Sequence, residues 1–518
     1  MSSGSIARAA AIVAVFGVLS RVLGFLREAV LSRAFGTSGV GGAQADAFVN
    51  SLFFVNTLAA MLLYALVTIV IPGFEQERKD RDDASAWRLL WAIGAWVTIV
   101  MCTISAITAL WPGAITALFG LGPVRAALME HLLQIMAAGL ALQGLSALFT
   151  AVLQSQRKYV GPAAVGVAFN LGIILGLAVG GRTIEAAAWG VVVGALAQVV
   201  LQLPQLVGVL RHVPGRPTLH HPRLKAVGVL AMPVLGASLL QQVNGYTDKL
   251  FANSLEAGRT AALNYANAAG SAPRTVLLLP LLTPFFPVIS RMVAQRRDDE
   301  ALSVFHRAAG VLALVSVPIG AFLMLYSTEL SSVLFGGRKC GDSCVADIAG
   351  PLRFYGLGVW GAFLGYLLNR TLSAANRAHE IMVATIITVA VTIGLDLILL
   401  GPMEQSGLAL ATSIGIYVNT ALTAWMLARR MPGLSLSLLA NRQVRLVVCG
   451  VLATAATLAL DSVVSSADRP AGATIALILA KGMVGLAVYV VALRIAAPAE
   501  LAEGRRAARS IFRRSKPA

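Results

Sequence analysis

The feature that most constrains this chain is a series of about fourteen long apolar stretches that fill most of its 518 residues. A helix needs roughly 20 mostly apolar residues to cross the hydrocarbon core of a bilayer. None of the stretches alternates apolar and polar residues as barrel strands do, so membrane-spanning helices are predicted. The predicted spans are 7–35, 47–73, 89–111, 128–154, 160–180, 184–210, 226–254, 260–290, 308–336, 350–369, 380–401, 406–428, 446–461 and 471–493.

The composition agrees with a membrane protein. Hydrophobic residues make up 57% of the chain and charged residues 13%, whereas a soluble domain carries about 25% charged residues. Four cysteines in a chain of this length do not make a disulfide scaffold. We therefore predict an all-α integral membrane protein and exclude a soluble enzyme, a coiled coil and a disordered chain.

The basic residues predict the orientation of these spans. Most of the 41 Lys and Arg residues fall in alternate loops and in the tails, for example Arg78, Lys79, Arg81 and Arg88. Cytoplasmic loops carry such an excess, so both termini are predicted to be cytoplasmic. The net charge of +17 is thereby explained by topology and by contact with anionic membrane lipids, without a nucleic-acid partner.

The spans divide into two sets of six and a pair. We predict an N-terminal lobe (1–211), a cytoplasmic connector (212–225), a C-terminal lobe (226–430), two further spans (431–495) and a basic cytoplasmic tail (496–518). Two lobes of equal topology are related by an axis along the membrane normal, and such transporters bind substrate between the lobes. A central cavity is therefore expected.

Charged residues inside the spans mark candidate binding residues, since a charge at the bilayer centre costs about 2.5–3.5 kcal/mol. Arg21, Arg27 and Glu28 lie in the first span, Asp46 opens the second, and Arg274 lies in the span 260–290. Arginine presents a planar fork to phosphate oxygens, so a cavity lined by Arg21 and Arg27 suits a diphosphate. For Arg33, Arg353 and Lys481, snorkelling to the membrane surface is the favoured interpretation.

A second candidate site is a cation site built from oxygen ligands. Asp396 is the acid deepest in a span, Thr392 precedes it by one turn, and Leu408 and Thr412 lie one turn apart in the next span. Asp248 adds a carboxylate from the span 226–254. Carboxylates, hydroxyls and a carbonyl suit a small alkali cation or a proton relay. The alternative is an Asp hydrogen-bonded by polar neighbours inside the bundle.

Two cysteines, Cys340 and Cys344, lie in an outside loop. An oxidising compartment would allow a small-loop disulfide there. A metal site is less favoured, because no second Cys or His pair is near.

Several motifs resemble the MurJ/MviN family of the multidrug/oligosaccharidyl-lipid/polysaccharide exporter superfamily. SRVLGFLRE at 20–28, followed by ADAF at 45–48, is similar to the opening of that family. TDKLFANSL at 247–255 with ALNYA at 262–266 is similar to its spans 7 and 8, and GLALATS at 407–413 to its span 12.

The resemblance implies a flippase for lipid II, the undecaprenyl-diphosphate-linked precursor of peptidoglycan. It implies a monomer of the bacterial inner membrane that works by alternating access, with the lipid tail in a groove at the last two spans. Arg21, Arg27 and Asp46 match positions of the family's cavity and gate. Asp248, Thr392, Asp396, Leu408 and Thr412 match its sodium site, with Thr392 in place of an Asn. No other cofactor and no enzymatic chemistry are expected.

Two departures from the family pattern leave alternatives open. The stretch Val55–Tyr64 lacks the family's arginine pair, and Ala268 stands where the family has an arginine. Arg274 lies six residues later, on another face. A flippase for another polyprenyl-diphosphate-linked sugar is therefore the main alternative. A cation-coupled drug antiporter would need an acidic cavity, and a polyprenyl-sugar transferase would need catalytic acids on a large outside loop.

Overall fold

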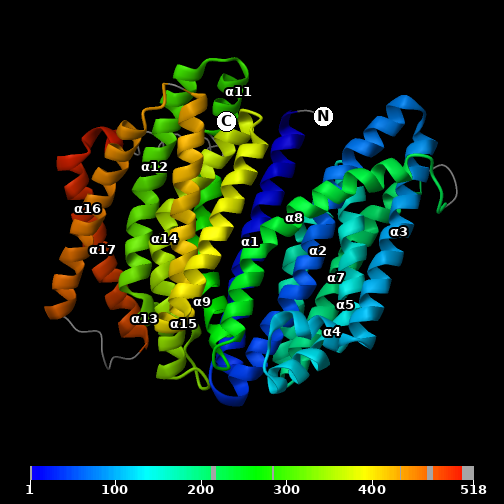
Figure 1. Cartoon of the computed structure of the whole chain (residues 1–518), viewed down its shortest axis with the longest axis horizontal. Helices are drawn as coiled ribbons and strands as arrows, with labels where there is room; N and C mark the ends of the chain where they lie inside the picture. Colours follow the sequence, from blue (N-terminus) through cyan, green and yellow to red (C-terminus); the bar gives the residue numbers. More distant parts are fainter. Residues whose placement is uncertain (1–2, 212–217, 283–284, 432, 464–470, 504–518) are drawn as a thin grey trace. The chain divides into compact units, whose positions relative to one another are not determined.

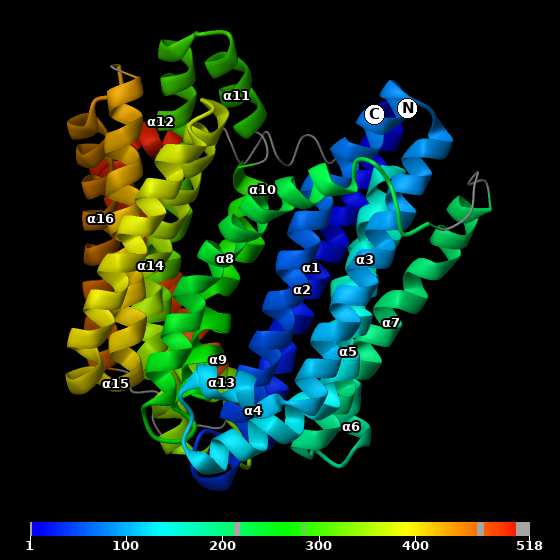
Figure 2. The same ribbon diagram turned by 45° about the vertical axis from the view of Figure 1, so that its right-hand side comes forward.

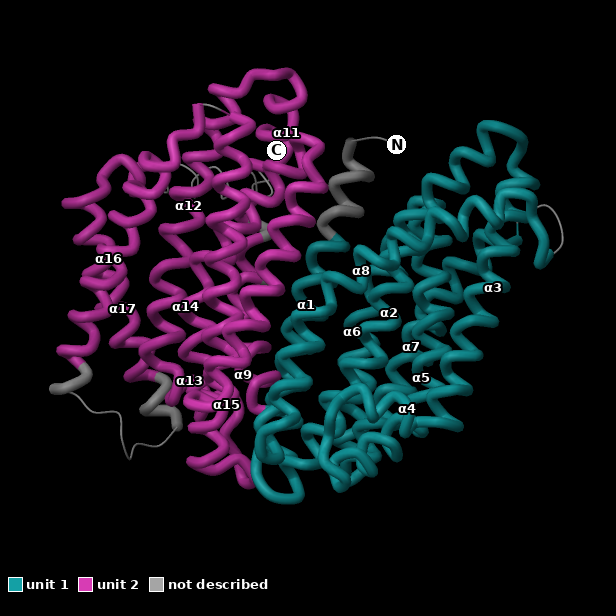
Figure 3. Tube along the Cα trace, viewed as in Figure 1, with its two compact units in different colours: residues 1–261 teal, residues 262–518 magenta. Residues whose placement is uncertain are grey.

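The computed structural model describes residues 3–211, 218–282, 285–431, 433–463 and 471–503, and this part of the chain consists of helices joined by short turns and loops (Figure 1). The predicted connector lies partly, and the predicted basic tail mostly, outside the described residues. The chain forms two compact units, residues 1–261 and 262–518 (Figure 3). Because units defined by compactness differ from lobes defined by topology, the predicted lobe boundaries stay a prediction.

Unit 1 contains seven long helices, counted within its described residues, and two short elements. They are α1 (Ser3–Phe35), α2 (Gly39–Asp80), α3 (Asp83–Leu110), α4 (Pro112–Thr116), η1 (Ala117–Phe119), α5 (Pro123–Ser155), α6 (Val160–Val179), α7 (Ile184–Leu210) and α8 (Leu224–Asn253).

The elements of unit 2 begin within α9 (Arg259–Pro273), which starts at the end of unit 1. They continue with η2 (Arg274–Leu278), α10 (Leu279–Leu282), α11 (Phe286–Ala294), α12 (Asp298–Leu325), α13 (Ser327–Phe335), α14 (Asp342–Ala374), α15 (Ala378–Arg430), α16 (Leu436–Val463) and α17 (Ala471–Ala496).

The structure confirms an all-α integral membrane protein. In the described residues, ten helices are long and apolar enough to cross a membrane. The number fourteen stays a prediction, partly because α15 joins the predicted spans 380–401 and 406–428 in one element. That element is two helices joined at Glu404, whose backbone is non-helical, with φ of 49°.

The prediction of one continuous span over 260–290 is wrong. Helix α9 ends at Pro273, a π-helical turn follows over Arg274–Leu278, and α11 begins at Phe286. Proline has no N–H to donate to the preceding turn, so the helix changes its hydrogen-bond pattern there. The predicted span 308–336 is likewise divided, at Tyr326, into α12 and α13.

In unit 1, α2 and α7 both pack against α5, and α6 packs along α7. The α6–α7 contact depends on glycines: a Cβ on Gly172 would lie 2.3 Å from the Cα of Gly194. Small residues let membrane helices approach closely, since lipid offers no hydrophobic drive for their association. Helix α8 crosses α2 obliquely (Figure 2) and packs on it, so its end near Asn253 reaches the start of α2.

In unit 2, α14 packs against both α12 and α15, and α16 and α17 pair beside α12. An apolar cluster that includes Val317, Leu446, Tyr489 and Leu493 joins α12, α16 and α17. A disulfide links Cys340 and Cys344, whose Cα atoms are 5.0 Å apart, between α13 and α14.

Candidate functional site

The two predicted phosphate ligands of α1 differ in their surroundings. Arg21 is exposed, while Arg27 is half-buried. The guanidinium of Arg27 forms an ion pair with Glu28, and its Nη1 donates a hydrogen bond of 2.9 Å to Asn170 Oδ1 in α6. The charge of Arg27 is therefore neutralised by one carboxylate. Its Nε atom is buried and forms no hydrogen bond with any described residue.

Sequence reasoning missed Asn170, which fixes Arg27 from the neighbouring helix. Asn170 Nδ2 donates to the carbonyls of Ser20 and Gly166, at 3.1 and 2.9 Å. A Cβ on Gly166 would lie 2.2 Å from Ser20 Oγ, so α6 and α1 touch here. The signal available in the sequence was an amide inside the apolar span 160–180, two residues before Gly172.

Asp46 lies in a separate cluster and is itself fully buried. Its carboxylate accepts hydrogen bonds from the backbone N–H groups of Gly258 and Ala261, at 2.7 and 2.8 Å. Arg125 at the start of α5 donates to it at 3.2 Å. A carboxylate at the first N–H groups of a helix satisfies donors that have no partner within the helix. Asp46 thus ties α2 to the start of α9 and to α5.

Two amides extend this cluster. Asn50 Nδ2 donates to Asn253 Oδ1 at 2.9 Å, and Asn253 Nδ2 donates to the carbonyl of Phe119 at 2.9 Å. Nη2 of Arg125 donates to the carbonyls of Asn253 and Leu255. We call Asp46, Asn50, Arg125, Asn253 and the backbone of Gly258 and Ala261 the Asp46 cluster.

Gly258 is needed for this approach. Its φ is +96°, and a Cβ there would lie 1.7 Å from the carbonyl oxygen of Thr37. Only glycine adopts that backbone at no steric cost. The loop before α9 can therefore lie directly on the turn between α1 and α2, which brings its N–H to Asp46.

The predicted cation ligands of unit 2 lie in the two arms of α15. Asp396, Thr392 and Leu408 are fully buried. A Cβ on Gly407 would lie 2.4 Å from the carbonyl oxygen of Leu399, and one on Gly415 would lie 2.2 Å from Thr392 Oγ1. Because the two arms touch both above and below Asp396, its side chain lies at the level of Leu408 and Thr412.

The side-chain oxygens of Thr392, Asp396 and Thr412 form no hydrogen bond with any described residue. Both carboxylate oxygens of Asp396 and the hydroxyls of Thr392 and Thr412 are buried without a hydrogen-bond partner among the described residues. A buried polar group without a partner is costly, so the donor set fits an alkali cation held by a carboxylate and hydroxyls. The fifth predicted ligand, Asp248, is in α8 of unit 1, and Arg274 is exposed at the start of η2 in unit 2.

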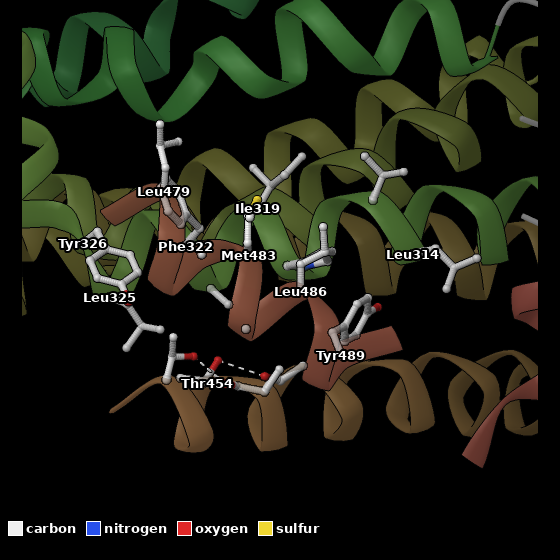
Figure 4. A pocket seen from close by; sticks show the side chains of 18 residues that line it. Leu314, Ile319, Phe322, Leu325, Tyr326, Thr454, Leu479, Met483, Leu486 and Tyr489 are labelled. Atoms are coloured by element: carbon white, nitrogen blue, oxygen red, sulfur yellow. Dashed lines mark hydrogen bonds between the residues drawn. The ribbon is translucent and has the colours of Figure 1, made fainter. Parts of the chain in front are cut away.

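An apolar pocket of about 470 Å³ lies between α12, α16 and α17 (Figure 4). Leu314, Ile319 and Phe322 of α12 face Leu479, Met483 and Leu486 of α17 across it. The threonine hydroxyls on its wall are used within α16: Thr454, for example, donates to the carbonyl of Gly450 at 2.8 Å. The pocket therefore offers hydrocarbon contact almost alone.

The chain is similar in sequence to proteins named as lipid II flippases. "Probable lipid II flippase MurJ" of Synechocystis sp. is 27% identical over 460 residues, 84% of each chain. "Lipid II flippase MurJ" of Burkholderia cenocepacia is 26% identical over 439 residues, 82% of this chain and 84% of the relative.

Solved structures of transporters share this fold. The chain is similar to a lipid II flippase MurJ in an inward closed conformation, with a TM-score of 0.79, 17% identity, and coverage of 93% of this chain and 98% of that one. It is also similar to an inward-facing multidrug resistance transporter of the MATE family, with a TM-score of 0.65, 14% identity, and coverage of 81% and 96%. The family model described as "Lipid II flippase MurJ" matches residues 31–468. The chain therefore belongs to the MurJ family.

Proposed function

We propose that this protein is a lipid II flippase, which moves the undecaprenyl-diphosphate-linked precursor of peptidoglycan from the inner to the outer leaflet. The observation that carries this function is the match to the family model over residues 31–468. The family is one of transporters, and the step moves a lipid without making or breaking a covalent bond.

In this mechanism Arg27 and Arg21 of α1 bind the diphosphate. The ion pair of Arg27 with Glu28 keeps the guanidinium stable inside the membrane before substrate arrives. Phosphate oxygens then take the free directions of the guanidinium fork. Substrate binding changes the conformation only if the diphosphate binds the two access states with different affinity.

Asp46 acts in this proposal as a gate residue rather than as a direct ligand of the substrate. Its three donors come from α5 and from the start of α9. Exit of the head group to the outside would require the Asp46 cluster to separate. The cluster keeps the outer side closed until the free energy of substrate binding compensates for breaking its hydrogen bonds.

We propose a sodium ion at the α15 turn, held by the Asp396 carboxylate, the Thr392 and Thr412 hydroxyls and the Leu408 carbonyl. Asp248 stays a ligand that the resemblance to the family implies. A bound cation would supply the positive charge that a buried carboxylate needs. The donor set supports this assignment through its unused buried oxygens.

The lipid tail is proposed to lie against α16 and α17. The apolar pocket between α12, α16 and α17 matches the chemistry of a polyprenyl chain. The protein is proposed to act as a monomer in the bacterial inner membrane with both termini in the cytoplasm. The disulfide of Cys340 and Cys344 supports an outside location of that loop, since disulfides persist in oxidising compartments.

A second candidate function is transport of another polyprenyl-diphosphate-linked sugar. Ala268 and the arginine-free stretch Val55–Tyr64 favour it, because this chain offers fewer positive side chains to the head group than the family pattern does. The two functions share the diphosphate and differ in the sugar.

A complementation experiment tests both functions. Cells depleted of their own lipid II flippase would express this protein, and lipid II in the outer leaflet would be measured with an external degrading enzyme. We expect rescue by the wild type, loss of rescue by Arg27→Ala, and rescue by Arg88→Ala, which removes an exposed arginine of α3. Failure of a wild-type chain that inserts normally would reject lipid II as the substrate.

A further inference from the structure

One cation in a membrane helix of unit 1 has not been assigned a role. Lys249 lies in α8, one turn before its last residue, Asn253. Its ammonium lies 5.1 Å from the ring centroid of Phe53 in α2. The side chain is half-buried, and it forms no hydrogen bond or ion pair with any residue that the structure describes.

The neighbouring arginines differ from Lys249 in this respect. Arg27 pairs with Glu28, and Arg125 pairs with Asp46. The carboxylates of Glu28, Asp248 and Asp46 act on the Lys249 ammonium electrostatically, but each lies beyond ion-pair distance. The three carboxylates therefore attract the Lys249 ammonium, but none of them forms an ion pair with it.

Helix packing alone does not account for this lysine. A snorkelling lysine carries its ammonium to the membrane surface, whereas this ammonium lies over an aromatic ring of the adjacent helix. A cation–π contact covers only one side of an ammonium. The remaining N–H donors need water or an anion, since an ionisable group inside a membrane usually marks a substrate or ion pathway.

We propose that Lys249 is a further ligand of the substrate's diphosphate, acting together with Arg27. This inference rests on the proposed function and names one more residue of the same site. Glu28 contacts Arg27 and acts electrostatically at longer range on Lys249, so one carboxylate influences both cations. A diphosphate carries more charge than Glu28 and has oxygens enough for a guanidinium fork and a rotatable ammonium.

The position of Lys249 also connects substrate binding to the gate. One turn further along α8, Asn253 hydrogen-bonds Asn50 and accepts from Arg125 through its carbonyl. A diphosphate held by Lys249 therefore acts on the same helix end that completes the Asp46 cluster. A diphosphate bound to Lys249 can thereby shift the end of α8 and favour the outward-open state. A contact between the protein and the sugar alone would not act on this helix end.

Binding measurements on the purified full chain test this role. Lys249→Met should weaken lipid II binding at least about tenfold, as loss of a charge-assisted hydrogen bond does, and Lys249→Arg should retain most of the affinity. The matched control is Lys225→Met, at an exposed lysine of the same helix, with no expected change. Inorganic diphosphate should compete with lipid II on the wild type and at least about tenfold less well on Lys249→Met.

A labelling experiment on the wild type makes the test independent of how variants fold. Lipid II or inorganic diphosphate should slow acetylation of Lys249 by an amine-reactive ester at least about tenfold, while Lys225 is labelled at the same rate. Equal labelling of Lys249 with and without either ligand, or wild-type affinity in Lys249→Met, would overturn the inference. If Arg27→Ala still weakens binding in that case, the proposed function stands. A wild type that does not bind lipid II would instead contradict the proposed function.

Discussion

Asn50 and Asn253 exchange hydrogen bonds through their side-chain amides: Asn50 Nδ2 donates to Asn253 Oδ1 at 2.9 Å, and Asn253 Nδ2 donates to Asn50 Oδ1 at 3.3 Å. Both residues are fully buried. The pair joins α2 to the end of α8, 203 residues away. Because the two hydrogen bonds join the same two side chains, α8 cannot leave α2 without breaking both at once.

The first prediction concerns Asp46. Asp46→Asn removes the fully buried anion that pairs with half-buried Arg125, and breaking a buried pair from one side costs about 3–5 kcal/mol. We expect backbone amides of residues 254–261 to exchange hydrogen roughly a hundredfold faster or more, measured by hydrogen–deuterium exchange. The matched variant Asp298→Asn, at an exposed acid, should leave exchange unchanged. Equal exchange in both variants would show that Asp46 does not hold this side closed.

The second prediction concerns Asn170. Asn170→Ala removes the acceptor of Arg27 and the two donors that fix the amide to α1 and α6. A hydrogen bond to a charged group contributes about 1.5–3 kcal/mol, so outer-leaflet lipid II should fall about tenfold or more at equal expression. Wild-type transport by Asn170→Ala would mean that Arg27 needs no support from α6.

The third prediction tests the cation at Asp396. Sodium that binds only the folded state raises the unfolding temperature with concentration. The wild type should therefore melt at a higher temperature in sodium chloride than in choline chloride at equal ionic strength. Asp396→Asn should abolish the difference, and Thr392→Asn, which keeps an oxygen ligand, should retain it. Identical melting of the wild type in both salts would exclude a sodium site of useful affinity.

The fourth prediction concerns pH and the segment before α8. Ser85 Oγ donates to Glu77 Oε1 at 2.6 Å, and His221 Nε2 lies 3.6 Å from the same oxygen. Arg223 donates its backbone N–H to His221 Nδ1, which suits a neutral imidazole. Burial lowers the pKa of His221 below its ordinary 6.5.

A lowered histidine pKa stabilises the folded state above pH 6.5, and this contribution is lost as pH falls below that value, because the unfolded chain then binds more protons. We expect residues 218–223 to exchange hydrogen relatively faster at pH 5.5 than at pH 7.5 after correction for intrinsic rates. His221→Gln should reduce this pH effect, whereas His131→Gln, at an exposed histidine of α5, should preserve it. A pH effect that persists in full in His221→Gln would contradict the assignment.

The class of protein followed from the sequence because the bilayer imposes a simple rule. A long apolar stretch must form its backbone hydrogen bonds internally, so composition and length predict helices without any tertiary information. The resemblance of residues 20–28 and 407–413 to a family was equally local. The break at Pro273 was missed because proline is tolerated in membrane helices, so its effect depends on the neighbours.

What only the tertiary structure decided is which charges meet. The sequence marked Arg27 and Asp46 as costly inside a membrane, and that cost is a property of each residue alone. The sequence did not show that Asn170 accepts a hydrogen bond from Arg27, or that Arg125 and the backbone N–H of Gly258 donate to Asp46. It also did not show that the Lys249 ammonium lies over the ring of Phe53. These partners are separated by up to 212 residues, and electrostatic contacts depend on distance in space, which only the packing of the helices sets.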